Sequence, residues 1–472
     1  MRICLILEGC YPYIRGGVST WMHQYINEMP EHEFVLWVIG AKAEDRDKFV
    51  YELPKNVVGV QQVFLDDALR VKESGGFMPS FTEEEVEAHR RLLASNHPDW
   101  DLLFELYQVR KINPMTYLKS PGFLETLTGL CEREFPFIAF SDAFHSVRSR
   151  LLPVLYLMGT PIPEADCYHA ICTGYGGLLA SMGAYIHKKP LLLTEHGIYT
   201  REREEEIIRA KWVARAFKPQ WIDFFYMLSD LIYSRAFRVT SLFTRAMHTQ
   251  MDMGCAPEKC RVIENGISYE RMCNIPLKEE NGIVDIGAVV RMAPIKDIKT
   301  MIYAFFELTC RMDNVRLHIM GGVDDEEYNE ECLALVKQLN LEDKIIFPGH
   351  VNIVEYFEKL DFTLLTSISE GQPLSVLESL AAKRPAVTTD VGCCSELLNG
   401  KPGDNFGKAG LYVPPMQREK LADAMEKLCE SRELRLQMGE AGQKRTYEYY
   451  RYHIMLTKYR ELYEEVEKEW QE

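Results

Sequence analysis

The sequence has no run of apolar residues long enough to cross a lipid bilayer. Its longest apolar stretches, such as residues 151–158, are far shorter than the roughly 20 residues that a membrane-spanning helix requires. The first apolar segment, residues 3–7, is too short for a secretory signal and lacks the small-residue cleavage site. These absences predict a soluble, cytoplasmic protein.

A positively charged surface for nucleic acid is also lacking. The chain has 54 Lys and Arg residues against 70 Asp and Glu residues, which gives a formal net charge of -16. A chain this acidic would need a local basic patch to neutralise phosphates, and no such patch stands out. We therefore do not expect nucleic acid among its partners.

The spacing of zinc ligands is absent as well. The 13 cysteines are scattered, with one adjacent pair at Cys393 and Cys394, and no CxxC is followed by a second one. An odd number without a framework indicates reduced cytosolic thiols. The acidic pairs at 66–67 and 324–325 lack the DxD spacing of a metal motif. We interpret both pairs as solvated loops, and we expect no metal ion or other cofactor.

The sequence does show the alternating strand and helix patterns that are typical of an α/β fold. Its 472 residues, 47% hydrophobic and 26% charged, predict a folded protein of two or three domains. Residues 3–7 read as a buried parallel strand, and a turn with Gly16 and Gly17 leads into a helical pattern at 18–29. Similar patterns predict strands at 34–39, 167–171, 190–194, 259–263, 283–290, 315–320, 345–347, 362–365 and 386–389, and helices at 298–310 and within 419–463.

Residues 275–282 form the best linker candidate because they are short, polar, and contain both Pro and Gly. The predicted fold class is therefore α/β, with two Rossmann-like doubly wound domains, 1–274 and 275–450, facing across a cleft. Residues 45–160 show no clear strand pattern and predict an insertion. Residues 451–472 predict a final helix that packs back on the N-terminal domain. An amphipathic stretch at 201–221 fits a core-facing helix, or alternatively a contact with a membrane or partner.

Glu370 and Glu378 flank the most informative segment. The segment between them, Gly371, Gln372, Pro373 and Leu374, follows a predicted strand and opens a helix, with Pro near the first helical position. The free N–H groups of that first turn can bind phosphate, and the two carboxylates can hold sugar and ribose hydroxyls. Taken alone, the two glutamates fit a surface helix equally well.

Together with other motifs, these residues resemble the retaining glycosyltransferases of family 4, which have the GT-B fold. The pattern Glu-Gly-x-Pro-Leu, a second Glu, Ala-x-x-Pro-x-Val and Thr-Asp-x-Gly stands at 370–374, 378, 382–387 and 389–392. Further motifs of the family occur in the same order along this chain, at Gly16 and Gly17, residues 194–197, residues 262–266, Gly287, Arg291, Lys296 and residues 347–350. The opening, residues 7–21, is most similar to the cytosolic glycosyltransferases of Pel-type exopolysaccharide systems. Gln372, Lys383, Arg384 and Cys393 depart from the family pattern, which leaves the donor sugar open.

The resemblance implies roles for individual residues. The N-terminal domain would face the acceptor and the C-terminal domain would bind the nucleotide sugar. Arg291 and Lys296 would stabilise the departing diphosphate in place of a metal ion. His196 would contact the donor sugar, Glu370 the sugar and Glu378 the ribose. The other substrate-binding candidates are Gly16, Gly17, Asn265, Gly371, Gln372, Pro373 and Leu374.

The resulting hypothesis is a retaining hexosyltransferase. It would use a UDP-sugar and a saccharide acceptor in exopolysaccharide biosynthesis, in the cytoplasm or at the inner face of the membrane, with a membrane polysaccharide-synthase complex as a candidate partner. Two alternatives stay open. One is a UDP-sugar epimerase or phosphorylase of the same fold, and the other is a non-catalytic nucleotide-sugar-binding subunit.

Overall fold

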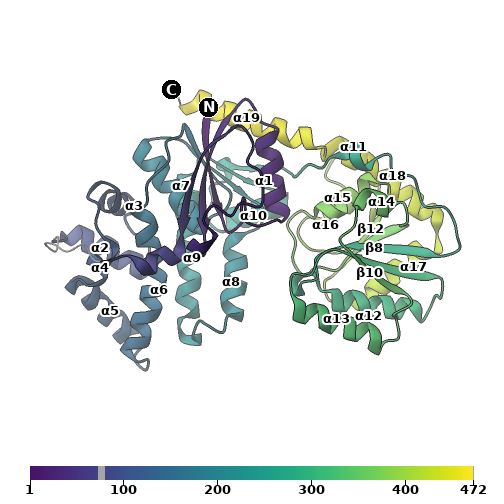
Figure 1. The fold of residues 1–472 in the computed structure, drawn as a ribbon, viewed down its shortest axis with the longest axis horizontal. Helices are drawn as coiled ribbons and strands as arrows, with labels where there is room; N and C mark the ends of the chain where they lie inside the picture. The colour runs from purple at the N-terminus through teal and green to yellow at the C-terminus, as the bar shows by residue number, and fades with distance from the viewer. Residues whose placement is uncertain (73–79, 471–472) are drawn as a thin grey trace. The chain divides into compact units, whose positions relative to one another are not determined.

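The computed structural model describes residues 1–72 and 80–470, which form two compact units (Figure 1). Unit 1 contains Met1–Ser241, Ala246–Val262 and Leu462–Glu472, and unit 2 contains Leu242–Arg245 and Ile263–Glu461. The main division therefore falls at 262/263, ahead of the 274/275 boundary read from the Pro- and Gly-containing linker. Part of the expected insertion, residues 73–79, lies outside the described residues.

Unit 1 is built on a parallel seven-stranded sheet of order β3-β2-β1-β4-β5-β6-β7. Its inner strand β1 is apolar and buried from Ile3 to Leu7 because helices cover both faces of the sheet. The strand order reverses between β1 and β4, as in a doubly wound fold. The strands are β1 (Arg2–Glu8), β2 (Glu33–Gly40), β3 (Val57–Phe64), β4 (Cys167–Ala170), β5 (Leu191–Glu195), β6 (Arg238–Ser241) and β7 (Cys260–Val262).

Residues 45–160 are not wholly an insertion, because they contain the edge strand β3. This strand was not predicted because it contains a glycine and two glutamines and is only partly buried.

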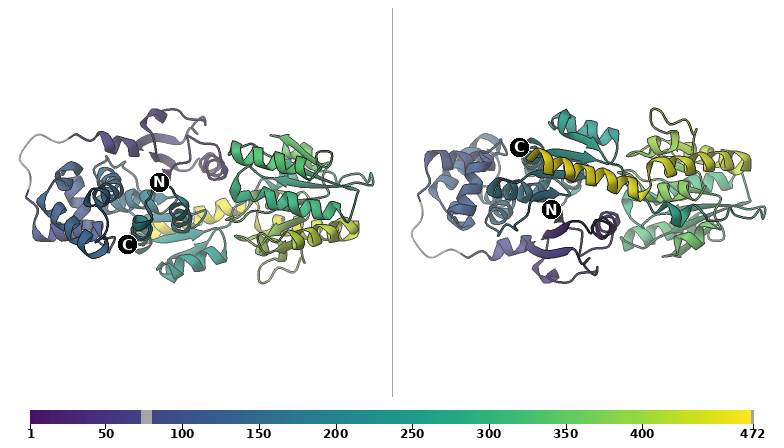
Figure 2. Two further views of the ribbon diagram at one scale, coloured as in Figure 1. Left: turned by 90° about the horizontal axis from the view of Figure 1, so that it is seen from below. Right: turned by 90° about the horizontal axis from the view of Figure 1, so that it is seen from above.

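Helices α2 to α6 gather at one end of unit 1 (Figures 1 and 2). The helices that begin before β7 are α1 (Gly17–Asn27), α2 (Glu83–Leu93), α3 (Trp100–Phe104), α4 (Pro114–Leu118), α5 (Pro121–Glu134), α6 (Phe140–Met158), α7 (Gly174–His187), α8 (Tyr199–Arg209), α9 (Lys218–Arg235) and α10 (Thr244–Asp252).

The last helix, α19 (Tyr452–Trp470), contributes its final residues to unit 1. The Tyr463 hydroxyl accepts a hydrogen bond from the Tyr25 hydroxyl at 2.7 Å and lies 2.7 Å from Nδ1 of the buried His169. The terminal amine of Met1 lies 3.9 Å from the Glu467 carboxylate. Residues from the two ends of the chain thus lie side by side in this unit (Figure 2).

Unit 2 repeats the doubly wound design with a parallel six-stranded sheet of order β10-β9-β8-β11-β12-β13. The strands are β8 (Val284–Val289), β9 (Val315–Met320), β10 (Ile345–Gly349), β11 (Phe362–Leu365), β12 (Ala386–Thr389) and β13 (Gly410–Val413). The helices are α11 (Tyr269–Met272), α12 (Ile298–Thr309), α13 (Glu326–Gln338), α14 (Ile353–Phe357), α15 (Leu374–Ala381), α16 (Cys394–Asn399), α17 (Arg418–Glu430) and α18 (Arg432–Tyr449).

The predicted fold class, two Rossmann-like doubly wound α/β domains, is confirmed. Ten strands were expected and lie where the apolar runs placed them, whereas β3, β6 and β13 were not foreseen. The helical stretch at 419–463 is divided into three helices. Ser431 makes the first break because its hydroxyl accepts a hydrogen bond from the Leu434 N–H at 3.1 Å and caps α18.

Candidate functional site

The strand order of unit 2 reverses between β8 and β11, which are neighbours in its sheet. In doubly wound folds, ligands bind beyond the carboxyl ends of the strands at such a reversal. The segment that follows β8 contains Arg291 and Lys296, and the segment that follows β11 contains Glu370. Of the four residues predicted to be catalytic, Glu370, His196, Arg291 and Lys296, all but His196 therefore follow the two strands at which this fold binds ligands.

Lys296 and Glu370 form an ion pair with 2.5 Å between Nζ and Oε1. Both side chains are largely buried, with exposed fractions of 17% and 12%. The two loops that carry them are joined by the Ile368 N–H, which donates to the Ile295 carbonyl at 2.9 Å. The Thr366 hydroxyl also donates to the Lys296 carbonyl at 3.0 Å. The charged pair is therefore held by a network of backbone contacts.

The Glu370 carboxylate is oriented by its own loop. The Ser367 hydroxyl donates to Oε1 of Glu370 at 2.6 Å, and the Ser367 carbonyl accepts from the Thr389 hydroxyl at 2.6 Å. Gly392 packs directly on the loop: at its φ of +56°, a Cβ would lie 2.1 Å from the Gly371 carbonyl oxygen. Glycine is required there, because any larger residue would displace the loop that positions Glu370.

Arg291 has a different partner from Lys296. Its guanidinium forms an ion pair with Asp324, and its side chain is 59% exposed. Asp325 caps α13 by accepting a hydrogen bond from the Tyr328 N–H at 3.0 Å. The acidic pair at 324–325 is thus a structural element of the loop that follows β9 rather than a freely solvated loop. The ion pair with Asp324 offsets the Arg291 charge, and an anion could compete for this guanidinium.

The turn between the two glutamates opens α15 as the sequence predicts. Pro373 is the N-cap residue and Leu374 the first helical residue. The side-chain oxygen of Gln372 is occupied, because it accepts a hydrogen bond from the Asn265 N–H at 2.6 Å. The Asn265 side-chain oxygen is itself buried and has no hydrogen-bond partner among residues 1–72 and 80–470. This oxygen is therefore an acceptor that a ligand hydroxyl could use.

Glu378 lies inside α15 and is partly buried. Burial raises the pKa of its carboxyl above the ordinary value, and the nearby charge of Arg271 opposes that rise. No hydrogen bond or ion pair of Glu378 occurs within the part of the chain that the structure describes. Cys393 is buried behind the preceding loop, and its N–H donates to the Gly371 carbonyl at 3.1 Å. The thiol at the position of the expected second glycine therefore faces the protein interior.

In unit 1, Gly16 and Gly17 form the start of α1. A Cβ at either position would meet nothing within 4 Å, so the space beside these two α-carbons is open, and Gly17 is exposed. Amide groups at a helix start can bind an anion. The open space fits the substrate-binding role that the resemblance implies.

His196 follows β5, and its ring packs edge-on against Trp21 with 4.4 Å between ring centroids. Burial lowers the pKa of its imidazole to about 4, so the ring is neutral at pH 7. Its Nε2 atom is buried and has no hydrogen-bond partner in the described ranges. A neutral ring with an unused nitrogen can exchange a hydrogen bond with a sugar hydroxyl.

The structure adds two glutamates that sequence reasoning did not single out. Glu195 is buried beside His196, and its carboxylate accepts hydrogen bonds from the Tyr233 hydroxyl at 2.6 Å and the Gln250 amide at 2.9 Å. Burial raises the pKa of Glu195 to about 7, although these hydrogen bonds oppose the rise. Glu8, at the end of β1, accepts from the Tyr199 hydroxyl at 2.8 Å and pairs with Arg203. Their positions at the ends of two predicted strands were the available signal.

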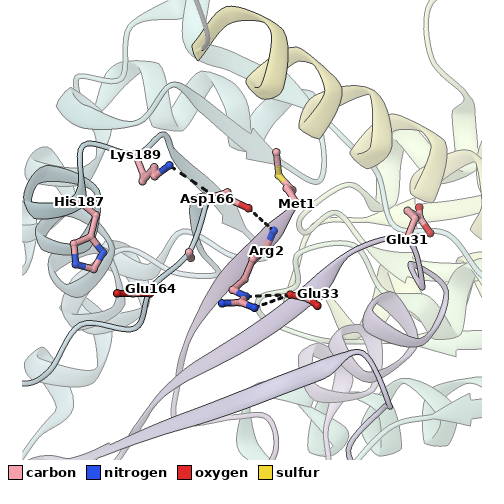
Figure 3. Close-up of a pocket in the computed structure, with 9 residues that line it drawn as sticks. Met1, Arg2, Glu31, Glu33, Glu164, Asp166, His187 and Lys189 are labelled. Carbon is pink, nitrogen blue, oxygen red and sulfur yellow. Dashed lines mark hydrogen bonds and ion pairs between the residues drawn. The ribbon is translucent and has the colours of Figure 1, made fainter.

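A separate cavity of about 620 Å³ lies at the opposite edge of the unit 1 sheet (Figure 3). Arg2 and Glu33 begin β1 and β2, and the cavity is lined by residues at the amino ends of the strands. Its cations are already paired: Arg2 with Glu33 at 2.9 Å and Lys189 with Asp166 at 4.0 Å. It is therefore unrelated to the carboxyl-end site.

Groups of three or more metal-binding side chains are not found among residues 1–72 and 80–470. Within the same described residues, every helix is too short or too polar to span a membrane.

Two family models match the chain. Residues 1–258 match the domain of unknown function DUF3492, and residues 277–445 match the glycosyl transferases group 1 model. The second match identifies the core of unit 2 as a glycosyl transferases group 1 domain and includes Arg291, Lys296, Glu370 and Glu378.

Similar curated proteins include an MMP alpha-(1->4)-mannosyltransferase from Mycolicibacterium hassiacum, 24% identical over 59% of this chain and 64% of that protein. Another is the N-acetyl-alpha-D-glucosaminyl L-malate synthase of Bacillus anthracis, 28% identical over 40% of this chain and 49% of that protein. The chain thus spans about half to two thirds of these relatives' lengths.

Solved structures resemble the whole chain. The Anabaena protein HepE in complex with UDP has a TM-score of 0.62 at 13% identity and covers 98% of this chain and 100% of its own. Sucrose-phosphate synthase from Thermosynechococcus elongatus has a TM-score of 0.60 at 15% identity, with 98% of each chain covered. At these identities the likeness shows the fold alone, and that fold is GT-B.

Proposed function

We propose that this chain, which belongs to the DUF3492 family and carries a glycosyl transferases group 1 domain, is a retaining glycosyltransferase that moves a hexose from a UDP-sugar to a saccharide acceptor. The observation that carries the proposal is the largely buried ion pair of Lys296 and Glu370 at the strand-order reversal of unit 2. Proteins of the same fold support a UDP-linked donor, since HepE forms complexes with UDP and with UDP-glucose.

The proposed chemistry follows from the charges at this site. When the bond between sugar and diphosphate breaks, negative charge grows on the departing phosphate oxygens. A fixed ammonium such as that of Lys296 stabilises this charge more in the transition state than in the ground state. Arg291 would add a second cation by exchanging Asp324 for a phosphate oxygen. With these two cations the proposal needs no metal ion.

The remaining groups bind and orient the substrates. In the proposed complex, Glu370 and Glu378 accept hydrogen bonds from sugar and ribose hydroxyls, and the amides at the start of α15 meet the phosphates. Neutral His196 hydrogen-bonds to the donor sugar. The departing phosphate oxygen takes the proton of the acceptor hydroxyl on the same face of the sugar, which retains the anomeric configuration.

We also propose that the acceptor belongs to an exopolysaccharide of the Pel type. The similarity of residues 7–21 to the cytosolic glycosyltransferases of those systems supports this role. The enzyme would then work in the cytoplasm, where UDP-sugars are made, beside a membrane synthase that exports the polymer.

The test is UDP release from a panel of UDP-sugars, after a thermal-shift screen has identified the donors that stabilise the protein. Glu370→Ala should lower release at least about a hundredfold, because the carboxylate acts on the reacting sugar. Glu342→Ala removes an exposed carboxylate elsewhere in unit 2 and serves as the matched control. Equal release by the wild type and Glu370→Ala would overturn the role of Glu370.

The two alternatives are separated by product analysis. An epimerase converts the UDP-sugar without an acceptor and releases no UDP, whereas a transferase forms a glycoside only when an acceptor is present. A binding subunit would bind UDP tightly and give turnover with none of the acceptors tested. The intact pair of Lys296 and Glu370 argues against such a loss of activity.

A further inference from the structure

Unit 1 exposes large apolar side chains on two connections that lie at the same end of its helical layer (Figure 1). On the turn between α5 and α6, Phe137 is 97% exposed. In the last turn of α8, Ile208 is 57% exposed, and on the connection that follows it to α9, Trp212 is 66% exposed. Contiguous apolar groups on a protein surface mark sites of contact with a partner or a membrane.

The two connections are held together by packed side chains beneath the exposed ones. The ring of Phe135 packs on that of Phe217 with 4.9 Å between centroids, and the Gln220 amide donates to the Glu134 carboxylate. Trp212 packs edge-on against Trp221 at 5.3 Å. The exposed tips therefore project from a fixed base, so little conformational freedom would be lost when they are buried.

The α8–α9 connection is also basic. Residues 207–222 contain four cationic side chains and no acidic one, in a chain of net charge -16. Lys218 caps the carbonyl of Ala210 at 2.9 Å, and Arg209 pairs with Glu205 at 3.5 Å. Lys211 and Arg215 are exposed and make no ion pair with any residue in 1–72 or 80–470.

We propose that Phe137, Ile208, Trp212, Lys211 and Arg215, here named the tip patch, dock on a bilayer that contains anionic phospholipid. Aromatic rings insert at the level of the lipid headgroups, and neighbouring Lys and Arg side chains attract anionic lipids. The chain as a whole has a net charge of -16 and is repelled by such a surface, and at this end Glu205 is paired with Arg209 while Glu134 accepts a hydrogen bond from Gln220. The proposal concerns attachment only and does not depend on the transferase reaction.

The test is co-sedimentation of the full chain with vesicles of phosphatidylcholine alone or with about a third phosphatidylglycerol. We expect binding to the anionic vesicles, weak binding to the neutral ones, and release as salt concentration rises. Phe137→Ser combined with Trp212→Ser should lower the partition coefficient about tenfold or more. Lys211→Glu combined with Arg215→Glu should lower it at least about fivefold.

Matched controls isolate the tip patch. Leu69→Ser removes another exposed apolar side chain of unit 1, and Lys55→Glu changes the charge at another exposed site. Both should bind like the wild type, and all variants should keep the wild-type circular dichroism spectrum. The proposal would be overturned by a lack of binding to anionic vesicles, or by unchanged binding of the Phe137 and Trp212 double variant. A parallel sedimentation with native membranes, before and after protease treatment of those membranes, tests for a protein partner. Binding only to untreated native membranes would identify such a partner and would also overturn the proposal.

Discussion

The carboxyl edges of the two sheets share a topology and differ in charge. In unit 2 the edge carries oppositely charged side chains in contact, with Lys296 on Glu370 and Arg291 on Asp324. In unit 1, burial at the end of β5 disfavours the charged forms, because the pKa of His196 falls to about 4 and that of Glu195 rises to about 7, although Glu8 at the end of β1 pairs with Arg203. Charged side chains at the carboxyl ends of the strands suit an ionic diphosphate, and uncharged polar side chains there suit the hydroxyl groups of a sugar.

A side chain that forms an ion pair in the free protein can exchange its partner for a charged group of the ligand. A carboxylate beside Lys296 keeps the ammonium from being an unpaired buried charge, which would be costly. A departing phosphate can then take over part of that role. Neutral groups such as His196 require no such partner, and its Nε2 is accordingly unpaired in the described residues. Four substitutions test this contrast.

The largest effect is expected for Lys296→Ala. Loss of the ammonium should lower the turnover number about a hundredfold to a thousandfold, since removal of one preorganised electrostatic contact to the transition state costs about 3–4 kcal/mol. UDP release under saturating donor measures it. Lys299→Ala is the matched control, because Lys299 lies three residues away and pairs with Glu331 at 2.6 Å. Similar losses for both variants would contradict a specific role of Lys296.

Glu195→Gln tests the raised pKa of Glu195 through the pH dependence of the unfolding free energy. A carboxyl whose folded-state pKa is raised contributes stability that is present below its unfolded pKa and is lost as the pH rises through about 7. Relative to Glu195→Gln, which does not titrate, the wild type should lose about 3 kcal/mol of unfolding free energy between pH 4.5 and 8. Urea unfolding at a series of pH values measures the difference. Parallel stability curves for the two proteins would show that Glu195 is ionised as usual.

Gly392→Ala tests how far the Glu370 loop depends on close packing. The added methyl would meet the Gly371 carbonyl, whereas Gly349, with a φ of +70° close to the +56° of Gly392, has nothing within 4 Å of an added Cβ. Both substitutions carry the cost of a positive φ, so their difference isolates the steric contact. We expect Gly392→Ala to cost about 2 kcal/mol more than Gly349→Ala in urea unfolding. Equal costs would mean that the loop moves freely.

The smallest effect is expected for His196→Ala. Loss of one hydrogen bond to the sugar should lower turnover about tenfold. Because the imidazole is neutral above about pH 4, wild-type turnover should show no transition from His196 between pH 5 and 8. His145→Ala, at an exposed site in unit 1, should leave turnover unchanged. A transition near pH 6.5 that disappears in His196→Ala would mean that the ring is protonated during the reaction.

Most strands could be read from the sequence because strands buried on both faces are continuous apolar runs. The exceptions have particular causes. β3 lies at a sheet edge and contains Gln61 and Gln62, and β6 has only four residues and begins with Arg238. The same limit applies to the site. The order of the motifs located Lys296 and Glu370. For Glu195 the only signal was its position at the end of a predicted strand, and that position does not show that the carboxyl is buried.

The sequence by itself determined the doubly wound fold and the segments that carry the candidate residues, because periodicity and turn residues are local properties of the chain. Only the tertiary structure decided the partners. Lys296 meets Glu370, although they are 74 residues apart, because β8 and β11 are adjacent at the reversal of strand order. Burial, which is also a property of the assembled fold, decided that the pKa of His196 falls to about 4 and that of Glu195 rises to about 7, while Lys296 and Glu370 form an ion pair.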